Sequence, residues 1–244
     1  YYLRFTSPRQ NSLILGNSRA AQGIRPDVLN HELQRDDLYN YSFTLATSPY
    51  GQVYLESIKK KLNTTSNAGI FILAVDPWSV SIQLERNQTY PDKNSILAST
   101  SVVDLDPNVI YLIRNYDKPY YHLLIDRKSS LHLHEDGWLE VSVKTDSASV
   151  EKRMKPKLSD YMKFISTREI SEFRLAYLRE TIRYLKSKGQ VYLVRLPVHP
   201  KMMEIEREFA PTFVQLTEKL AKENMVRFFD LTYLNSQVRY TDGN

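Results

Sequence analysis

A serine follows the first apolar run of the chain, at a position where a nucleophile could be held. Residues 12–16 read Ser-Leu-Ile-Leu-Gly, and Asn17, Ser18 and Arg19 come next. A serine between a strand and a helix has its hydroxyl at the edge of a sheet, and the amides that open the helix can stabilise an oxyanion. Ser18 is therefore a candidate nucleophile. Simple capping of the next helix explains its position equally well.

Polar side chains also follow the other apolar runs. Together with Asn17 and Arg19, the candidate oxyanion or substrate-binding residues are Ser48, Asp76, Trp78 and Arg195. Arg19 could pair with Asp76 or bind an anionic group. Trp78 could stack on a sugar, line an acyl pocket or lie in the core. Arg195 lies within an apolar run, where a charge needs a partner, so we expect an ion pair or a functional role.

Five apolar runs predict the strands that would position these residues. The predicted strands are residues 12–16, 38–45, 69–75, 190–196 and 225–231. Buried runs of this kind are typical of a parallel sheet, and its carboxyl ends meet at one edge, where ligands bind. We expect an α/β fold with three layers, α/β/α, around a mostly parallel sheet of about five strands, flavodoxin-like in topology.

Helical periodicity predicts the segments between the strands. A turn and two short helices are expected over 18–33, the second beginning at Pro26, and a helix is expected from Ser48 to about residue 62. Long helices are predicted over 159–188, with Gly189 as the C-terminal cap, and over 202–224. Residues 79–156 lose the alternation, with helical character over 109–124 and a short strand over 138–143. We interpret 79–156 as an insertion in a single domain spanning 1–244.

The composition of the chain argues against several classes of function. The net charge is +5 and modestly spread, and the basic segment 152–157 is interpreted as a solvated loop, so we do not expect nucleic-acid binding. The chain has no cysteine, and His132 and His134 lack a third ligand at a fixed spacing, so no metal site and no cofactor are expected. No apolar run reaches the roughly 20 residues that span a bilayer.

The chain resembles the SGNH hydrolase superfamily (GDSL-like), in particular the membrane-associated bacterial branch that includes the D-alanine transfer protein of teichoic-acid synthesis and alginate-acetylation proteins. Residues 13–19 resemble the first block, normally Gly-Asp-Ser, with Asn17 replacing the aspartate. Residues 70–78 resemble the third block, with Asp76 where many members have asparagine. Residues 228–230 and 240–244 resemble the approach to the terminal Asp-x-x-His block, with Asp242 on the aspartate. A counterpart of the second-block glycine is not evident near 41–51.

The resemblance implies acyl transfer through an acyl-enzyme on Ser18. Asp242 would orient a histidine that would come directly after Asn244, and His199 is the fallback base within the chain. The implied substrate is an acylated glycan or cell-envelope polymer, with a membrane-bound acyltransferase as a further partner. The implied location is extracytoplasmic, in the periplasm or on the outer face of the cytoplasmic membrane, with an N-terminal anchor.

Two other functions stay open. One is an inactive relative that binds a glycan or a membrane acyltransferase. It is compatible with the departures from the family blocks, which are Asn17, Asp76 and the missing second-block glycine. A nucleotide-binding α/β protein is disfavoured, because no Gly-x-Gly-x-x-Gly or Gly-Lys-Ser/Thr loop follows a strand.

Overall fold

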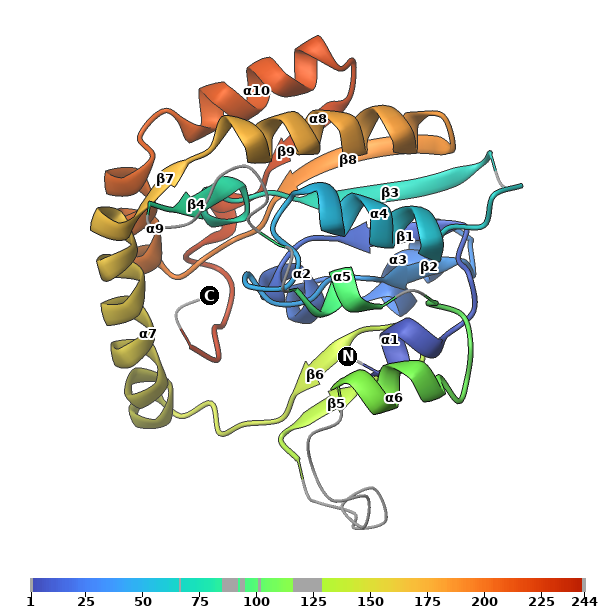
Figure 1. Ribbon diagram of the computed structural model, residues 1–244. Helices are drawn as coiled ribbons and strands as arrows, with labels where there is room; N and C mark the ends of the chain where they lie inside the picture. The colour runs from blue at the N-terminus through green and yellow to red at the C-terminus, as the bar shows by residue number, and fades with distance from the viewer. Residues whose placement is uncertain are drawn as a thin grey trace.

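A five-stranded parallel sheet forms the centre of the protein (Figure 1). We describe a computed structural model that places residues 2–65, 67–84, 92, 95–100, 102–115 and 129–242. The strands are β1 (Ser12–Leu15), β2 (Leu38–Asn40), β3 (Gly69–Ala74), β8 (Gly189–Arg195) and β9 (Arg227–Asp230). Their order is β2-β1-β3-β8-β9, with every pair parallel. The predicted α/β fold with a flavodoxin-like strand order is confirmed.

Helices cover both faces of this sheet (Figure 1). On one face lie α4 (Gln52–Lys61), α8 (Glu172–Lys186) and α10 (Phe213–Glu223), which pack on the larger hydrophobic core. On the other face lie α2 (Ser18–Gly23) and α3 (Pro26–Glu32), above a smaller core. Right-handed crossovers between parallel strands require this alternation of faces. The result is a three-layer arrangement, and all five strands end at one edge.

The chain leaves the sheet after β3 and returns before α8. This excursion contains η1 (Trp78–Val80), β4 (Ser81–Gln83), α5 (Ile96–Ser99), α6 (Val109–Asn115), β5 (Leu131–Leu133), β6 (Leu139–Val141), α7 (Ser147–Thr167) and β7 (Arg168–Ile170). An antiparallel pair of β4 and β7 closes it. The predicted insertion end at Pro156 falls inside α7. Part of the predicted helix over 109–124 is α6, and residues 116–124 lie outside the described residues.

Several predicted element boundaries are wrong. The helix over 159–188 is broken, because residues 168–170 adopt extended backbone and pair with β4. Gly189 opens β8 at a φ of 158°, and Ser187 is the C-cap of α8. The helix over 202–224 is two helices, α9 (Pro200–Phe209) and α10, separated at Pro211. The pairing of β4 with β7 is a long-range contact that local periodicity cannot predict.

Three further corrections concern predicted element boundaries in segments near the candidate site. Helix α4 begins three residues after Pro49, with Gly51 rather than Ser48 as its N-cap. Strand β2 ends at Asn40, earlier than residue 45. The basic segment 152–157, predicted as a loop, lies within α7.

The remaining elements are α1 (Tyr2–Thr6) and η3 (Thr232–Leu234). No helix in the described part of the chain is long and apolar enough to cross a bilayer.

Candidate functional site

Gly16 makes the sharp turn between β1 and α2. Its φ is 149°, which side chains disfavour, and a Cβ there would lie 2.9 Å from the Cβ of Ala74 and 3.0 Å from that of Ala20. The turn therefore packs directly against the end of β3. Ser48 secures it from the other side, since its hydroxyl donates to the Gly16 carbonyl at 2.7 Å.

Asn17 joins the ends of β1 and β3. Its side-chain oxygen accepts from the Arg19 backbone N–H at 3.0 Å, which makes Asn17 the N-cap of α2. Its amide nitrogen donates to the Asp76 carboxylate at 2.6 Å. Asp76 also accepts from the Ser79 backbone N–H at 2.8 Å, and both Asn17 and Asp76 are buried. These two predicted residues therefore hold the turn that presents Ser18, and neither lines the cavities described below.

Ser18 lies between two cavities, as the first residue of α2. The first cavity has a volume of about 380 Å³ and is walled by the loop after β2, by β4 and by α7. The second, of about 510 Å³, is walled by α2, β6 and the segment before the C-terminus. Within the described residues, the Ser18 hydroxyl takes part in no side-chain hydrogen bond. A group bound in either cavity would therefore meet an uncommitted hydroxyl.

The walls of the two cavities differ in chemistry. Around the first lie the aromatic rings of Tyr161 and Phe164 and the cationic side chains Lys157, Arg168 and Arg174. Around the second lie the uncharged and charged polar side chains Gln22, Glu140, Arg239 and Tyr240, together with Trp138. Both cavities combine apolar surface with polar groups that can orient a ligand, which is typical of small-molecule sites.

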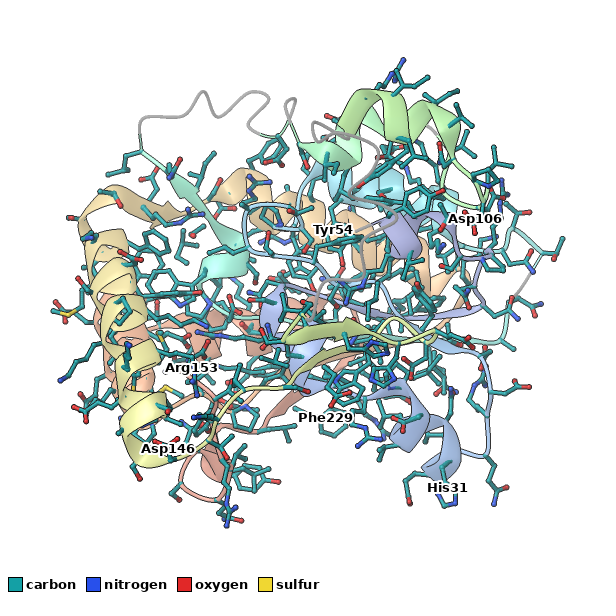
Figure 2. All side chains as sticks on the ribbon, turned by 90° about the horizontal axis from the view of Figure 1, so that it is seen from below. His31, Tyr54, Asp106, Asp146, Arg153 and Phe229 are labelled. Carbon is teal, nitrogen blue, oxygen red and sulfur yellow. The ribbon has the colours of Figure 1, made fainter. Side chains whose placement is uncertain are left out.

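Asp242 reaches the same edge of the sheet through contacts with α7. The Lys157 ammonium lies 2.7 Å from the Asp242 carboxylate, and Nε of Arg153 donates to the Thr241 carbonyl at 2.8 Å. Figure 1 shows the C-terminal segment between α7 and α2, and Figure 2 labels Arg153, which is part of α7. The structure therefore brings Asp242 and Ser18 to one region, with Lys157 in contact with Asp242 and lining the first Ser18 cavity.

A buried ion-pair network lies behind Ser18. Arg19 and Arg195 both bind Glu206, at 2.5 Å and 3.0 Å, and the Trp78 indole N–H donates to the same carboxylate at 3.0 Å. Arg19 also lies 3.5 Å from Asp76. Burial alone would lower the pKa of Arg19, but the carboxylates of Glu206 and Asp76 outweigh it and raise that pKa. Both predicted arginines are thus ion-paired, and Arg19 also lines the second Ser18 cavity.

Three further predicted residues lie away from the cavities. Ser48 and Trp78 are fully buried, and Trp78 stacks on Phe209 with ring centroids 4.5 Å apart. His199 caps α9 by accepting from the Lys201 backbone N–H at 3.2 Å, and burial lowers its pKa. It lines neither Ser18 cavity among the described lining residues.

Glu206 and Lys157 are the residues that sequence reasoning missed. Glu206 stands four positions after Met202, on the apolar face of α9, and a carboxylate there signals a buried ion pair. Lys157 stands four positions after Arg153, so in a helix both project from one side. The prediction of a loop over 152–157 does not use this spacing, because it applies only to a helix.

The histidine pair of the insertion lies on the β5–β6 hairpin. His134 contacts Glu140 through Nε2 at 2.9 Å and stacks on Trp138, with ring centroids 4.6 Å apart. In the described ranges, no group of three histidine or carboxylate side chains is arranged to hold a metal ion. The hairpin contributes Trp138 and Glu140 to the wall of the second Ser18 cavity.

The arrangement is suited to chemistry at one hydroxyl between two bound groups. Ser18 contributes a hydroxyl to both cavities, each of which can hold a group beside it, and Lys157, ion-paired with Asp242, contributes a titratable group to the first cavity. No protein-family model matches the chain, and no curated protein matches its sequence.

Proposed function

We propose that this chain is an SGNH-type serine esterase or O-acyltransferase that forms an acyl-enzyme on Ser18. The observation that carries the proposal is the position of Ser18, at the carboxyl end of β1, between a cavity of about 380 Å³ and one of about 510 Å³. Two cavities at one nucleophile suit an acyl donor on one side and an acceptor hydroxyl or water on the other.

The two departures from the family pattern support the proposal because they compensate each other. The resembled blocks carry an aspartate before the serine and often an asparagine after the third strand, whereas this chain has Asn17 and Asp76. The side chains of Asn17 and Asp76 meet at 2.6 Å. One amide and one carboxylate are therefore present at this contact, with their positions exchanged.

The proposed substrate is an acylated glycan or cell-envelope polymer. The polar and aromatic walls on both sides of Ser18 suit sugar hydroxyls and their ester groups. From the resemblance we also propose an extracytoplasmic location at the bacterial cytoplasmic membrane, with a membrane-bound acyltransferase as partner.

Fluorophosphonate labelling tests the function directly. The chain, with whatever residues naturally follow Asn244, is treated with a fluorophosphonate, and the modified residue is found by mass spectrometry. We expect one adduct on Ser18 and none in Ser18→Ala. Ser166→Ala is the matched control, because Ser166 is an exposed serine on α7, and it should label as the wild type does.

A second candidate function is a non-catalytic protein that binds a glycan or a membrane acyltransferase in the same cavities. The observation that favours it is the engagement of Asp242 by Lys157, which occupies the carboxylate expected to orient a base. A folded wild-type protein that forms no Ser18 adduct but binds an acylated glycan saturably would establish this function and exclude the first.

A further inference from the structure

A cavity of about 220 Å³ lies at the carboxyl ends of β8 and β9. Its walls are formed by Arg195 and Asp230, which end these two strands, and by the segment that joins α9 to the first turn of α10. None of its described lining residues lines either Ser18 cavity. The cavity is smaller than the roughly 300 Å³ at which drug-sized pockets begin, so it suits a small ligand at the sheet edge where ligands bind.

Arg195 places unused hydrogen-bond donors in the wall of this cavity. Its side chain is 6% exposed, and Nη2 donates to the Glu206 carboxylate at 3.0 Å and to the Met203 sulfur at 3.5 Å. Within the described part of the chain, Nε has no acceptor, and Nη1 donates no hydrogen bond and lies 3.8 Å from the Asp230 carboxylate. A buried donor without an acceptor is costly, and a guanidinium has five N–H groups. The ion pair with Glu206 therefore accounts for only part of the donors of Arg195.

Arg207 adds a second positive charge to the cavity. It lies in the last turn of α9, is exposed and lines the same cavity. Its guanidinium has no ion-pair or hydrogen-bond partner among the residues that the structure describes. Against these two arginines, Asp230 is the one carboxylate among the described lining residues, so the wall carries a net positive charge.

The first turn of α10 adds backbone donors. This helix has 11 residues, and its N-cap, Thr212, makes no side-chain cap hydrogen bond. The N–H of Phe213 donates to the Ala210 carbonyl at 3.1 Å, whereas the N–H groups of Val214 and Gln215 have no acceptor in the described chain. Val214 and Gln215 both line the cavity. Free amides and the positive end of the helix dipole favour an anion there.

Asp230 restricts the kind of anion that fits. Its Oδ1 accepts from the Thr232 backbone N–H at 3.0 Å and from the Thr232 hydroxyl at 2.7 Å. Its Oδ2 accepts no hydrogen bond from any described residue. A carboxylate repels an anion without a proton but accepts a hydrogen bond from one that retains a proton. Hydrogen phosphate retains such a proton at neutral pH, whereas sulfate has none and a phosphate monoester loses its proton with a pKa of about 6.

We propose that this cavity is a binding site for inorganic phosphate in its hydrogen phosphate form. Nη1 of Arg195, the guanidinium of Arg207 and the two free amides of α10 donate to the phosphate oxygens, and the phosphate hydroxyl donates to Oδ2 of Asp230. Guanidinium groups match the geometry of phosphate, and hydrogen bonds between charged groups are the strong ones. The assignment is independent of the chemistry at Ser18.

Titration calorimetry with sodium phosphate, at pH 7.5 in a buffer without other oxyanions, tests the site. We expect one phosphate per chain and a higher thermal midpoint in its presence, because a ligand that binds only the folded state stabilises it. Sulfate and glycerol 3-phosphate should bind about 10-fold more weakly or worse, since neither has a proton to donate to Asp230 and each loses one hydrogen bond to a charged group. Glycerol 3-phosphate thereby separates free phosphate from a phosphate monoester as the ligand.

Arg207→Gln should weaken phosphate binding by about 10-fold or more, through the loss of one charge-assisted hydrogen bond. Arg207 is exposed, so the variant should fold, and thermal unfolding without phosphate checks this. Lys201→Gln is the matched control, because it removes the same charge from an exposed position of the same helix that does not line the cavity. It should bind phosphate as the wild type does.

Asp230→Asn supplies a readout that a general change of charge would not move. The asparagine keeps an acceptor for Thr232 and replaces the Oδ2 acceptor with a donor, so the preference for phosphate over sulfate should fall from about 10-fold to about one. Glu208→Gln makes the same change of charge at an exposed position beside Arg207 and should keep the wild-type preference.

The outcomes are separate from those of the Ser18 labelling. A folded wild-type protein that gives no saturable heat with phosphate overturns the site, and unchanged affinity in Arg207→Gln overturns its location. Equal affinities of the wild type for phosphate and sulfate overturn the assignment to hydrogen phosphate. Each of these results leaves the proposed function standing, and a protein that forms no Ser18 adduct leaves the phosphate site standing.

Discussion

The guanidinium of Arg19 lies 2.5 Å from the carboxylate of Glu206, 187 residues away in the sequence. The contact joins α2, which carries Ser18, to α9, and Glu206 also binds Arg195 and the Trp78 indole. All four side chains are buried. The position of the candidate nucleophile therefore depends on an internal carboxylate that is not among the described residues lining either Ser18 cavity.

Glu206→Gln should destabilise the fold. The change leaves two buried guanidinium groups without their shared counter-charge, and removing one partner from a buried ion pair costs about 3 to 5 kcal/mol. Urea unfolding would measure the loss. Glu208→Gln, at an exposed position of the same helix, is the control and should change the unfolding free energy by less than about 0.5 kcal/mol. Equal midpoints for the two variants would contradict the role of Glu206.

The double variant that exchanges Asn17 and Asp76 should recover most of the unfolding free energy that the single substitutions lose. Asn17→Asp places a second carboxylate where the Asn17 amide now donates to Asp76 at 2.6 Å. We expect a loss of about 1 to 3 kcal/mol at pH 7, the cost of a buried polar group without its partner. The double variant Asn17→Asp with Asp76→Asn recovers an amide–carboxylate pair and most of that loss. A double-mutant cycle measures the coupling, and strict additivity would argue against it.

The stability of the Asn17→Asp variant should also depend on pH, and the sign of this dependence follows from its two adjacent carboxylates. Two adjacent carboxylates raise the pKa of one of them in the folded state above its unfolded value. The folded state then binds more protons, so the stability deficit of Asn17→Asp shrinks as pH falls from 7 to 4 and grows as pH rises. Unfolding free energies at the two pH values, each compared with the wild type, provide the measurement.

Lys61 should make the stability of the protein rise with pH. Its side chain is fully buried and donates to Ser7 and to the Val103 carbonyl, and burial lowers its pKa from 10.5 to about 7. Between pH 7 and 10.5 the unfolded chain holds a proton that the folded chain has released, so stability increases with pH over that range. The full change is on the order of 5 kcal/mol.

Lys61→Met tests this dependence because methionine removes the titration and keeps much of the apolar volume. The variant should show a smaller rise in unfolding free energy than the wild type between pH 7 and 10. Lys59→Met changes a partly exposed lysine of the same helix and should keep the wild-type slope. If all three proteins have the same slope, Lys61 keeps an ordinary pKa in the folded state.

Gly16→Ala should destabilise the protein and slow the labelling of Ser18. The new Cβ would lie 2.9 Å from Ala74, and a φ of 149° is strained for alanine; strained backbone conformations cost about 1 to 3 kcal/mol each. Gly23→Ala is the matched control on α2, since its Cβ would meet only Leu196 at 3.8 Å. Equal thermal midpoints for the two variants would show that the turn at Gly16 tolerates a side chain.

The sequence by itself determined the sheet and the position of the candidate nucleophile. Short apolar runs such as the one in β3 are local signals, and each of the five predicted strands is found in the structure. Because parallel strands end at one edge, the residues after them gather there whatever the rest of the chain does. Asn17, Ser18 and Asp76 were predicted on that ground alone, and they lie at the ends of β1 and β3.

Only the tertiary structure decided which charges meet and where the long helices break. The pairing of Arg19 with Glu206 and of Lys157 with Asp242 joins segments far apart in sequence, so no local pattern specifies either partner. The break at residues 168–170 has the same origin, because β7 forms by pairing its backbone with β4, which lies far away in the sequence. Periodicity reports which face of a segment is buried, but partners and register depend on the packing of the whole chain.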